Sequence, residues 1–259
     1  MNDQILKPGD RDYVGALASG LDVLQAFDAE HRRMTLSEVA TCTEMDRAKA
    51  RRLLLTLHAL GFVKRSARQF ELTPRVLQLG YAYQASNQYR IVIQQQLEAI
   101  TEELGESSSL AVLDADDVVY VIRSAARHRL MAITLSVGTR LPAAYTSMGR
   151  VLLAQLSEVE VSAFLERVEL EAFTAFSITS PAALKQEIDR VRENGYAIVD
   201  QELDSGLRSV AVPVFSGTDE LVGAINISTN AARVDMETLK GVYLRRLEAA
   251  AAAVARTTK

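Results

Sequence analysis

The feature that most constrains this chain is the stretch from Thr35 to Leu60, which reads as two short helices joined by a tight turn. Thr35 and Glu38 form a T-x-x-E capping box, a signature of a helix start, and Asp46 is a good N-cap for the second helix. Apolar residues recur at helical spacing along that second helix, namely Ala50, Leu53, Leu54, Leu57 and Leu60. Gly61 stands where a helix commonly ends. The pattern is typical of a helix-turn-helix.

The second helix carries a dense group of cations in its N-terminal turns. They are Arg47, Lys49, Arg51 and Arg52. In a recognition helix these turns reach the base edges in the major groove. Arginine can read guanine through two hydrogen bonds, and either arginine or lysine can pair with phosphate. We therefore predict that this helix binds double-stranded operator DNA.

A basic segment after this helix is predicted to form a two-stranded hairpin. Apolar residues stand at both ends of this segment, at Phe62 and at Leu72. Between them lie the cations Lys64, Arg65 and Arg68. A helix-turn-helix followed by such a hairpin is a winged helix, and the hairpin tip can contact the DNA backbone. The alternative is a small helical bundle with a solvated basic face. The order of capping box, turn, basic helix and basic hairpin favours the winged helix.

The basic residues of the chain are concentrated in the segment that is predicted to bind DNA. The net charge of the 259 residues is −4. Residues 31–75, however, contain ten Lys/Arg and four Asp/Glu, whereas residues 76–259 contain seventeen Lys/Arg and twenty-three Asp/Glu. The acidic remainder disfavours non-specific binding to DNA. It therefore argues against an architectural protein that binds DNA regardless of sequence.

Composition limits the other classes of protein that the chain can belong to. Hydrophobic residues make up 48% of the chain and charged residues 24%, which allows a sizeable core in one large or two ordinary domains. No apolar run approaches the roughly 20 residues that span a membrane, and the N-terminal segment lacks a signal-peptide core. We expect a cytoplasmic location and no membrane partner. With one cysteine, Cys42, and three histidines, we expect no disulfide, no metal site and no cofactor.

The chain divides into three expected parts. A winged helix-turn-helix domain covers residues 13–74, with its first helix over 13–27, a linker helix covers 75–89, and an effector-binding domain covers 90–259. The linker helix is too apolar to be a free linker, so we expect it to pack against a partner subunit. The alternative is an ordinary surface helix of one domain.

Residues 90–259 mix helical and strand patterns, as in an α+β domain. Helices are expected over 91–104, 147–156, 158–168, 181–194 and 234–255, and strands over 109–113, 118–122, 131–137, 196–199, 208–215 and 221–228. Residues 114–117 and 217–220 read as turns, and 138–142 as a loop. Such elements form a twisted antiparallel sheet covered by helices.

Two groups of polar residues in this domain are candidates for a small-molecule site. Thr146 can cap a helix whose free backbone N–H groups near Ser147 and Met148 attract a carboxylate. The second group lies at the ends of later strands and consists of Asp200, Glu202, Ser209, Asn226 and Ser228. Because some of these residues alternate with apolar ones, they can line a pocket. An empty capped helix and solvent-exposed strand residues are the alternatives.

Three segments resemble IclR-type transcriptional regulators, over residues 15 to 256 approximately. They are RAKARRLLLTLHALGFV in the helix-turn-helix, VGTRLPAAYTSMGRVLLA at residues 137–154, and VDQELDSGLRSVAVPV followed by GAINIST. The middle segment is specific, since TSMGR after GTRLPA is characteristic of the branch that controls aromatic-acid catabolism through the β-ketoadipate pathway. The resemblance implies a winged helix joined by a linker helix to a GAF-like effector domain.

The resemblance also implies partners and site residues. Such regulators are homodimers, often paired into dimers of dimers, on palindromic operators, and an activator also contacts RNA polymerase. Effectors of the branch are small carboxylates such as protocatechuate, 4-hydroxybenzoate and β-ketoadipate. The effector contacts implied by the motifs are Ser147, Met148, Asp200, Ser209, Asn226 and Ser228. Members often read PAYCTSMGR, whereas this chain has Ala144 and Tyr145 where the Tyr and Cys stand, which leaves the choice of effector open.

An enzyme that acts on a small carboxylate is the alternative to a ligand-responsive regulator. A hydrolase needs a positioned nucleophile and base, but the chain has no G-x-S-x-G motif and no histidine after His128. A carboxylate base at Asp200 or Glu202 would remain for other reactions. We expect no catalytic residue, and we interpret the chain as a regulator.

Overall fold

The computed structural model describes residues 6–86, 88–126 and 135–257. The chain separates into two compact units, Met1–Ser86 and Asn87–Lys259. Each unit combines helices with an antiparallel sheet and has its own apolar core. The linker helix expected over residues 75–89 lies mostly in the first unit, which ends at Ser86. The α+β fold class predicted from the sequence is confirmed.

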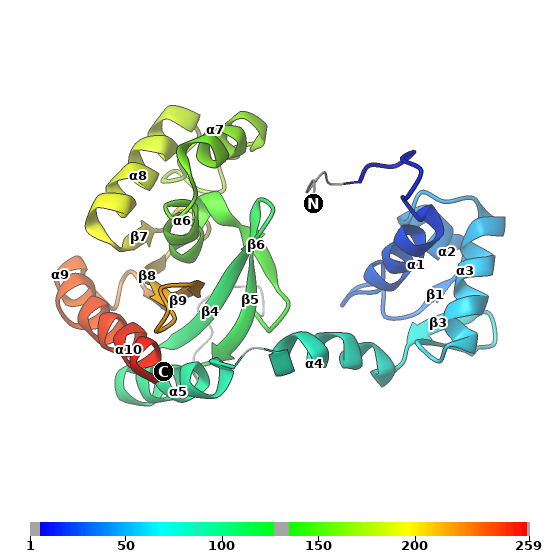
Figure 1. Cartoon of the computed structure of the whole chain (residues 1–259), viewed down its shortest axis with the longest axis horizontal. Coiled ribbons are helices and arrows are strands. Elements are labelled where there is room, and N and C mark those ends of the chain that lie inside the picture. Colours follow the sequence, from blue (N-terminus) through cyan, green and yellow to red (C-terminus); the bar gives the residue numbers. More distant parts are fainter. Residues whose placement is uncertain (1–5, 87, 127–134, 258–259) are drawn as a thin grey trace. The chain divides into compact units, whose positions relative to one another are not determined.

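The N-terminal unit is a winged helix (Figure 1). It contains α1 (Gly15–Gln25), β1 (Met34–Thr35), α2 (Leu36–Cys42), α3 (Arg47–Ala59), β2 (Val63–Ser66) and β3 (Gln69–Leu72). Strands β2 and β3 form the predicted hairpin. Strand β1 could not be predicted, because two residues are too short to show a strand periodicity. It pairs with β3 and completes a three-stranded sheet in the order β1-β3-β2.

Side-chain caps set the ends of the two central helices where the sequence predicts them. The hydroxyl of Thr35 accepts a hydrogen bond from the N–H of Glu38, whose carboxylate accepts one from the N–H of Thr35. The carboxylate of Asp46 accepts a hydrogen bond of 2.9 Å from the N–H of Lys49. Gly61 follows α3 with a φ of +78°, a conformation that glycine adopts without strain. Local sequence therefore determines the geometry of the helix-turn-helix.

A helix with exposed apolar side chains follows the wing. The 3-10 turn η1 (Pro74–Val76) leads into α4 (Leu77–Ser86). Large apolar side chains on α4 remain exposed in the single chain, with 71% of Leu77, 54% of Leu79 and 71% of Tyr81 accessible. Contact of this helix with a partner subunit stays a prediction.

The C-terminal unit is built on a six-stranded antiparallel sheet in the order β6-β5-β4-β9-β8-β7. The strands are β4 (Ser107–Asp114), β5 (Asp117–Ser124), β6 (Arg140–Pro142), β7 (Ala197–Asp200), β8 (Leu207–Phe215) and β9 (Leu221–Asn230). The residues of β6 were expected to form part of a loop. They form a strand because they pair with residues 117–119 of β5. Of the strand expected over 131–137, residues 131–134 lie outside the described residues, and 135–137 are not in a strand.

Helices cover both faces of this sheet (Figure 1). One face packs against α5 (Arg90–Leu104) and α10 (Leu244–Thr257), and the other against α6 (Ser147–Leu153), α7 (Glu158–Arg167) and α8 (Pro181–Asn194). The predicted closing helix is divided into α9 (Met236–Thr238), a π-helical turn (Leu239–Tyr243) and α10. Residues of a strand alternate between the two cores. Ala211 and Ala224 face α6, whereas Val210 and Ile225 face α10.

The described residues contain neither a membrane-spanning helix nor a cluster of metal-binding side chains. Among them, no helix is long and apolar enough to cross a membrane. Within the same ranges, no group of three or more His, Cys, Asp or Glu side chains is arranged to hold a metal ion.

Candidate functional site

A basic groove lies between α3 and the β2–β3 hairpin in the N-terminal unit. Its lining residues are Thr35, Leu36, Ser37, Arg47, Arg51, Leu55, Arg65, Arg68 and Phe70. Arg47 and Arg51 are four residues apart on α3, so they project from the same side of the helix. Arg65 and Arg68 come from the hairpin. Four of the residues predicted to bind DNA therefore share one surface.

The arginines of this groove form no ion pair with any residue that the structure describes. The ion pairs within the described part of the N-terminal unit involve His31, Arg33 and Lys64, and none of them includes a groove arginine. The Nε of Arg65 donates to the carbonyl oxygen of Ala67, 3.0 Å away, which orients the side chain without removing its charge. An uncompensated positive surface of this kind is suited to the phosphates of DNA.

The other predicted DNA-binding cations, Lys49, Arg52 and Lys64, lie outside the groove lining. Lys49 is half-buried, and Arg52 is exposed on α3. The Nζ of Lys64 lies 3.0 Å from the carboxylate of Glu71, which also pairs with Arg33. These two cations, Lys64 foremost, lower the pKa of Glu71. The charge of Lys64 is therefore partly satisfied within the protein, unlike the charges of the groove.

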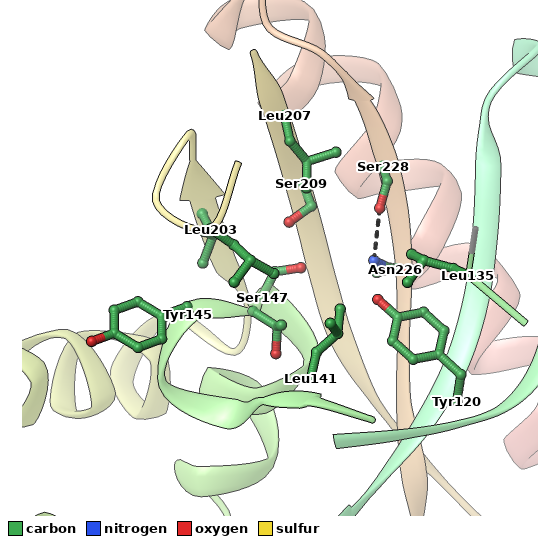
Figure 2. Close-up of a pocket in the computed structure, with 12 residues that line it drawn as sticks. Tyr120, Leu135, Leu141, Tyr145, Ser147, Leu203, Leu207, Ser209, Asn226 and Ser228 are labelled. Carbon is green, nitrogen blue, oxygen red and sulfur yellow. Dashed lines mark hydrogen bonds between the residues drawn. The ribbon is translucent and has the colours of Figure 1, made fainter. Parts of the chain in front are cut away.

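The C-terminal unit has a pocket between the start of α6 and the sheet (Figure 2). It is lined by Tyr120, Leu135, Leu141, Tyr145, Thr146, Ser147, Val199, Leu203, Leu207, Ser209, Asn226 and Ser228. Apolar walls with a few polar groups are the usual composition of small-molecule sites. The free volume of the cavity is about 20 Å³, which is room for roughly one water molecule.

Besides the Oη of Tyr145, which points away from the pocket (Figure 2), two polar atoms of the lining residues are buried without a partner among the described residues. The Oγ of Ser147 and the Oδ1 of Asn226 form no hydrogen bond with any part of the chain that the structure describes, although the Nδ2 of Asn226 donates to Ser228. A buried polar atom left unpaired costs about 1–3 kcal/mol. A polar group of a bound molecule would remove that cost, so these atoms mark the pocket as a binding site.

A buried tyrosine adds a third polar group to the pocket. A tyrosine hydroxyl keeps its proton at neutral pH and can donate a hydrogen bond, and burial strengthens this state of Tyr120 by raising its pKa to about 12. Figure 2 shows this hydroxyl pointing towards Asn226. Tyr120 was not among the predicted site residues, because it lies within an apolar run of the predicted strand 118–122.

The start of α6 is shaped by its cap and by one glycine. The hydroxyl of Thr146 accepts the N–H of Gly149 at 3.0 Å, as predicted, which leaves the N–H groups of Ser147 and Met148 without a place in the helical ladder. The side chain of Met148 is fully buried in the core and does not line the pocket. A Cβ on Gly149 would lie 2.1 Å from the carbonyl oxygen of Ala143, so a larger residue cannot occupy this position without displacing the preceding turn.

A buried ion pair ties α6 to the loop after β7. Arg150 donates to the two carboxylate oxygens of Glu202 at 2.7 and 2.5 Å, and its Nε donates to the carbonyl of Ala144 at 3.0 Å. Only 1% of Arg150 and 7% of Glu202 are exposed. Two parallel hydrogen bonds fix the guanidinium and carboxylate planes relative to each other. This pair therefore holds one wall of the pocket in place.

The structure places Asp200 away from the pocket, contrary to the expectation from the sequence. Its two carboxylate oxygens each accept a hydrogen bond of 2.8 Å from Arg208. Successive residues of a strand face opposite sides, and Val199 lines the pocket, so Asp200 faces the other side of the sheet. Of the predicted effector contacts, those that line the pocket are Ser147, Ser209, Asn226 and Ser228.

Comparison with known proteins matches most of the chain to one family of regulators. The family model for the bacterial transcriptional regulator IclR C-terminal domain matches residues 82–256, and the IclR helix-turn-helix model matches residues 16–67. The Pca regulon regulatory protein of Pseudomonas putida is 41% identical over 242 residues, which are 93% of this chain and 83% of that protein.

Solved structures show the same fold. A transcriptional regulator from Rhodococcus sp. RHA1 has 45% identity and a TM-score of 0.81, covering 94% of this chain and 98% of its own. The inducer-binding domain of the PobR transcription factor from Acinetobacter, a double mutant in complex with 3-hydroxybenzoic acid, has 28% identity and a TM-score of 0.59, covering 63% of this chain and 95% of its own. These proteins are named as regulators, not enzymes. The chain therefore belongs to the IclR family of bacterial transcriptional regulators.

Proposed function

We propose that this protein regulates genes of aromatic-acid catabolism, and that a small aromatic acid bound in the C-terminal pocket controls its binding to operator DNA. The observation that carries the proposal is the pair of buried, unpartnered atoms at Ser147 and Asn226. The names of similar proteins support the class of effector, since one is the regulatory protein of a Pca regulon and another is a double mutant of the PobR inducer-binding domain in complex with 3-hydroxybenzoic acid.

DNA would be bound by the arginines of the groove. In this proposal α3 enters the major groove, where Arg47 and Arg51 contact base edges, and the hairpin arginines contact phosphates. Lys49, Arg52 and Lys64 would add phosphate contacts around this surface. The interaction takes place in the cytoplasm, where the operator DNA is.

A second copy of the chain is the proposed partner of α4. The exposed Leu77, Leu79 and Tyr81 of this helix supply an apolar surface suited to a subunit contact. Two-fold pairing would place two recognition helices on the two halves of a palindromic operator. We also propose that two such dimers can pair into a tetramer. If the protein is an activator, it also contacts RNA polymerase.

The small volume of the cavity gives the effector a means of control. An aromatic acid is larger than the roughly one water molecule that fits, so it must move the pocket walls apart. Because the ion pair between Arg150 and Glu202 anchors the α6 wall, the opposite walls are expected to move. A ligand that binds the widened conformation more tightly shifts the population towards it.

Thermal denaturation of the full-length protein tests this effector class. At 100 times its dissociation constant, an effector stabilises the fold by about 2.7 kcal/mol, enough to shift the midpoint measurably. We expect such a shift with 4-hydroxybenzoate, 3-hydroxybenzoate or protocatechuate. Asn226→Ala should reduce the shift, because it removes a polar group of the pocket. Arg190→Ala, on the exposed face of α8, should leave it unchanged. The absence of a shift with every acid tested, β-ketoadipate included, would contradict the proposal.

A further inference from the structure

A row of polar side chains continues from the pocket across three neighbouring strands. Asn226 of β9 lies opposite Ser109 of β4, and Ser109 lies opposite Arg123 of β5. Opposed residues of paired strands project from the same face of a sheet. The Nη1 of Arg123 donates to the hydroxyl of Ser109 at 3.0 Å, which confirms the shared face. Arg123 therefore stands two strands from Asn226, on the face of the sheet that the pocket occupies.

A β-bulge brings Arg123 to this face. Leu110 pairs with Ile122, but the next residue, Ala111, pairs with Tyr120, so Val121 is an extra residue on β5. Tyr120 and Arg123 are three positions apart and would face opposite sides in a regular strand. Because of the extra residue, Tyr120 and Arg123 project from the same face of the sheet. Val121 and Ile122 both pack into the core on the opposite face, against α5 and α10. Re-aiming a side chain is a common consequence of a bulge near a binding site.

The guanidinium of Arg123 is left with an unused edge. Its Nε is buried and has no partner among the described residues, while Nη1 is held by Ser109. No ion pair within the described ranges includes Arg123, and burial lowers its pKa, opposed by the nearby Tyr120. Nε and Nη2 together form the edge of the guanidinium that can donate two parallel hydrogen bonds to a carboxylate. Arg123 is thus a half-buried cation without a counter-charge in the part of the chain that the structure describes.

We propose that Arg123 binds the carboxylate of the effector, and that the polar groups at the start of α6 bind the hydroxyl at the other end of the aromatic ring. The inference rests on the function proposed above and adds the orientation of the ligand to it. Ser147 then pairs with the ring hydroxyl instead of the acid. An anionic group on the ligand is favoured, because the hydrogen bonds of a guanidinium to a charged acceptor are stronger than those to a neutral one.

Calorimetric titration of the full-length protein with 4-hydroxybenzoate and with its neutral isostere 4-hydroxybenzamide tests this assignment. The wild-type protein should prefer the acid by roughly 10- to 100-fold, the range for hydrogen bonds to a charged group. Arg123→Met should abolish this preference by weakening the binding of the acid alone. Arg123→Lys keeps the charge but loses the fork of donors, so it should retain part of the preference. The matched control Arg190→Met, on α8, should bind both compounds as the wild type does.

The outcomes separate this inference from the proposed function. If the wild type binds acid and amide equally, or if Arg123→Met keeps the preference for the acid, Arg123 is not the anchor although the effector class stands. If the wild type binds no aromatic acid at all, the proposed function fails and the inference fails with it. Should Arg123→Met not fold, Ser109→Ala provides a second variant, because removing the hydroxyl that orients Arg123 should also lower the preference for the acid.

Discussion

Replacing Glu202 with alanine is expected to lower the unfolding free energy of the C-terminal unit by about 3–5 kcal/mol, the range for breaking a buried ion pair. The variant leaves the guanidinium of Arg150 buried, with the carbonyl of Ala144 as its remaining partner. Desolvation of that unpaired charge is what makes the loss large. Urea denaturation of the full-length protein, followed through the transition of the C-terminal unit, measures it.

Two further variants show whether burial is the cause. Asp116→Ala breaks the exposed pair between Arg167 and Asp116, whose atoms lie 2.6 Å apart, and should cost less than about 1 kcal/mol because water screens this pair. The double variant Arg150→Met/Glu202→Leu removes both buried charges and should recover most of the lost stability. Equal losses for Glu202→Ala and Asp116→Ala would show that the buried pair does not anchor α6.

Replacing Arg51 with alanine is expected to weaken operator binding by roughly 5- to 150-fold, which corresponds to the 1–3 kcal/mol of a good arginine–base contact. Arg51 lines the basic groove on α3 and takes part in no ion pair within the described residues, so its full charge is available to DNA. Fluorescence anisotropy with an operator fragment, selected from random DNA with the wild-type protein, measures the change.

Lys64 supplies the comparison from the same unit. Because Lys64 already pairs with Glu71, Lys64→Ala should weaken operator binding much less than Arg51→Ala does. Neither variant should change the binding of 4-hydroxybenzoate. A larger effect from Lys64 than from Arg51 would mean that the hairpin, and not α3, makes the decisive contacts.

Elements with strong local signals could be predicted from the sequence. The bounds of α8 are those expected, because Ser180 caps the helix, Pro181 occupies its first turn and Gly195 ends it in a left-handed conformation. The caps at Thr35 and Asp46 similarly fix the helix-turn-helix. In each case the residues that determine the bounds of the helix lie within it or next to it. The local sequence is therefore sufficient to predict these bounds.

Features that depend on distant pairing could not be predicted. Arg150 and Glu202 are 52 residues apart, and no local pattern links them. The exclusion of Asp200 from the pocket depends on which face of β7 meets α6, which the strand pattern alone left open. Arg123 was missed because the bulge at Val121 shifts the alternation of β5, and a bulge leaves no mark in a run of apolar residues.

The measurement that tests the central claim most directly is operator affinity with and without a saturating aromatic acid. For an acid that stabilises the protein, linkage between the two sites predicts a change in operator affinity of roughly 5- to 150-fold. Asn226→Ala, which alters the pocket and not the groove, should bind the operator normally and lose most of this response. An operator affinity that stays the same when 4-hydroxybenzoate fills the pocket would contradict the account.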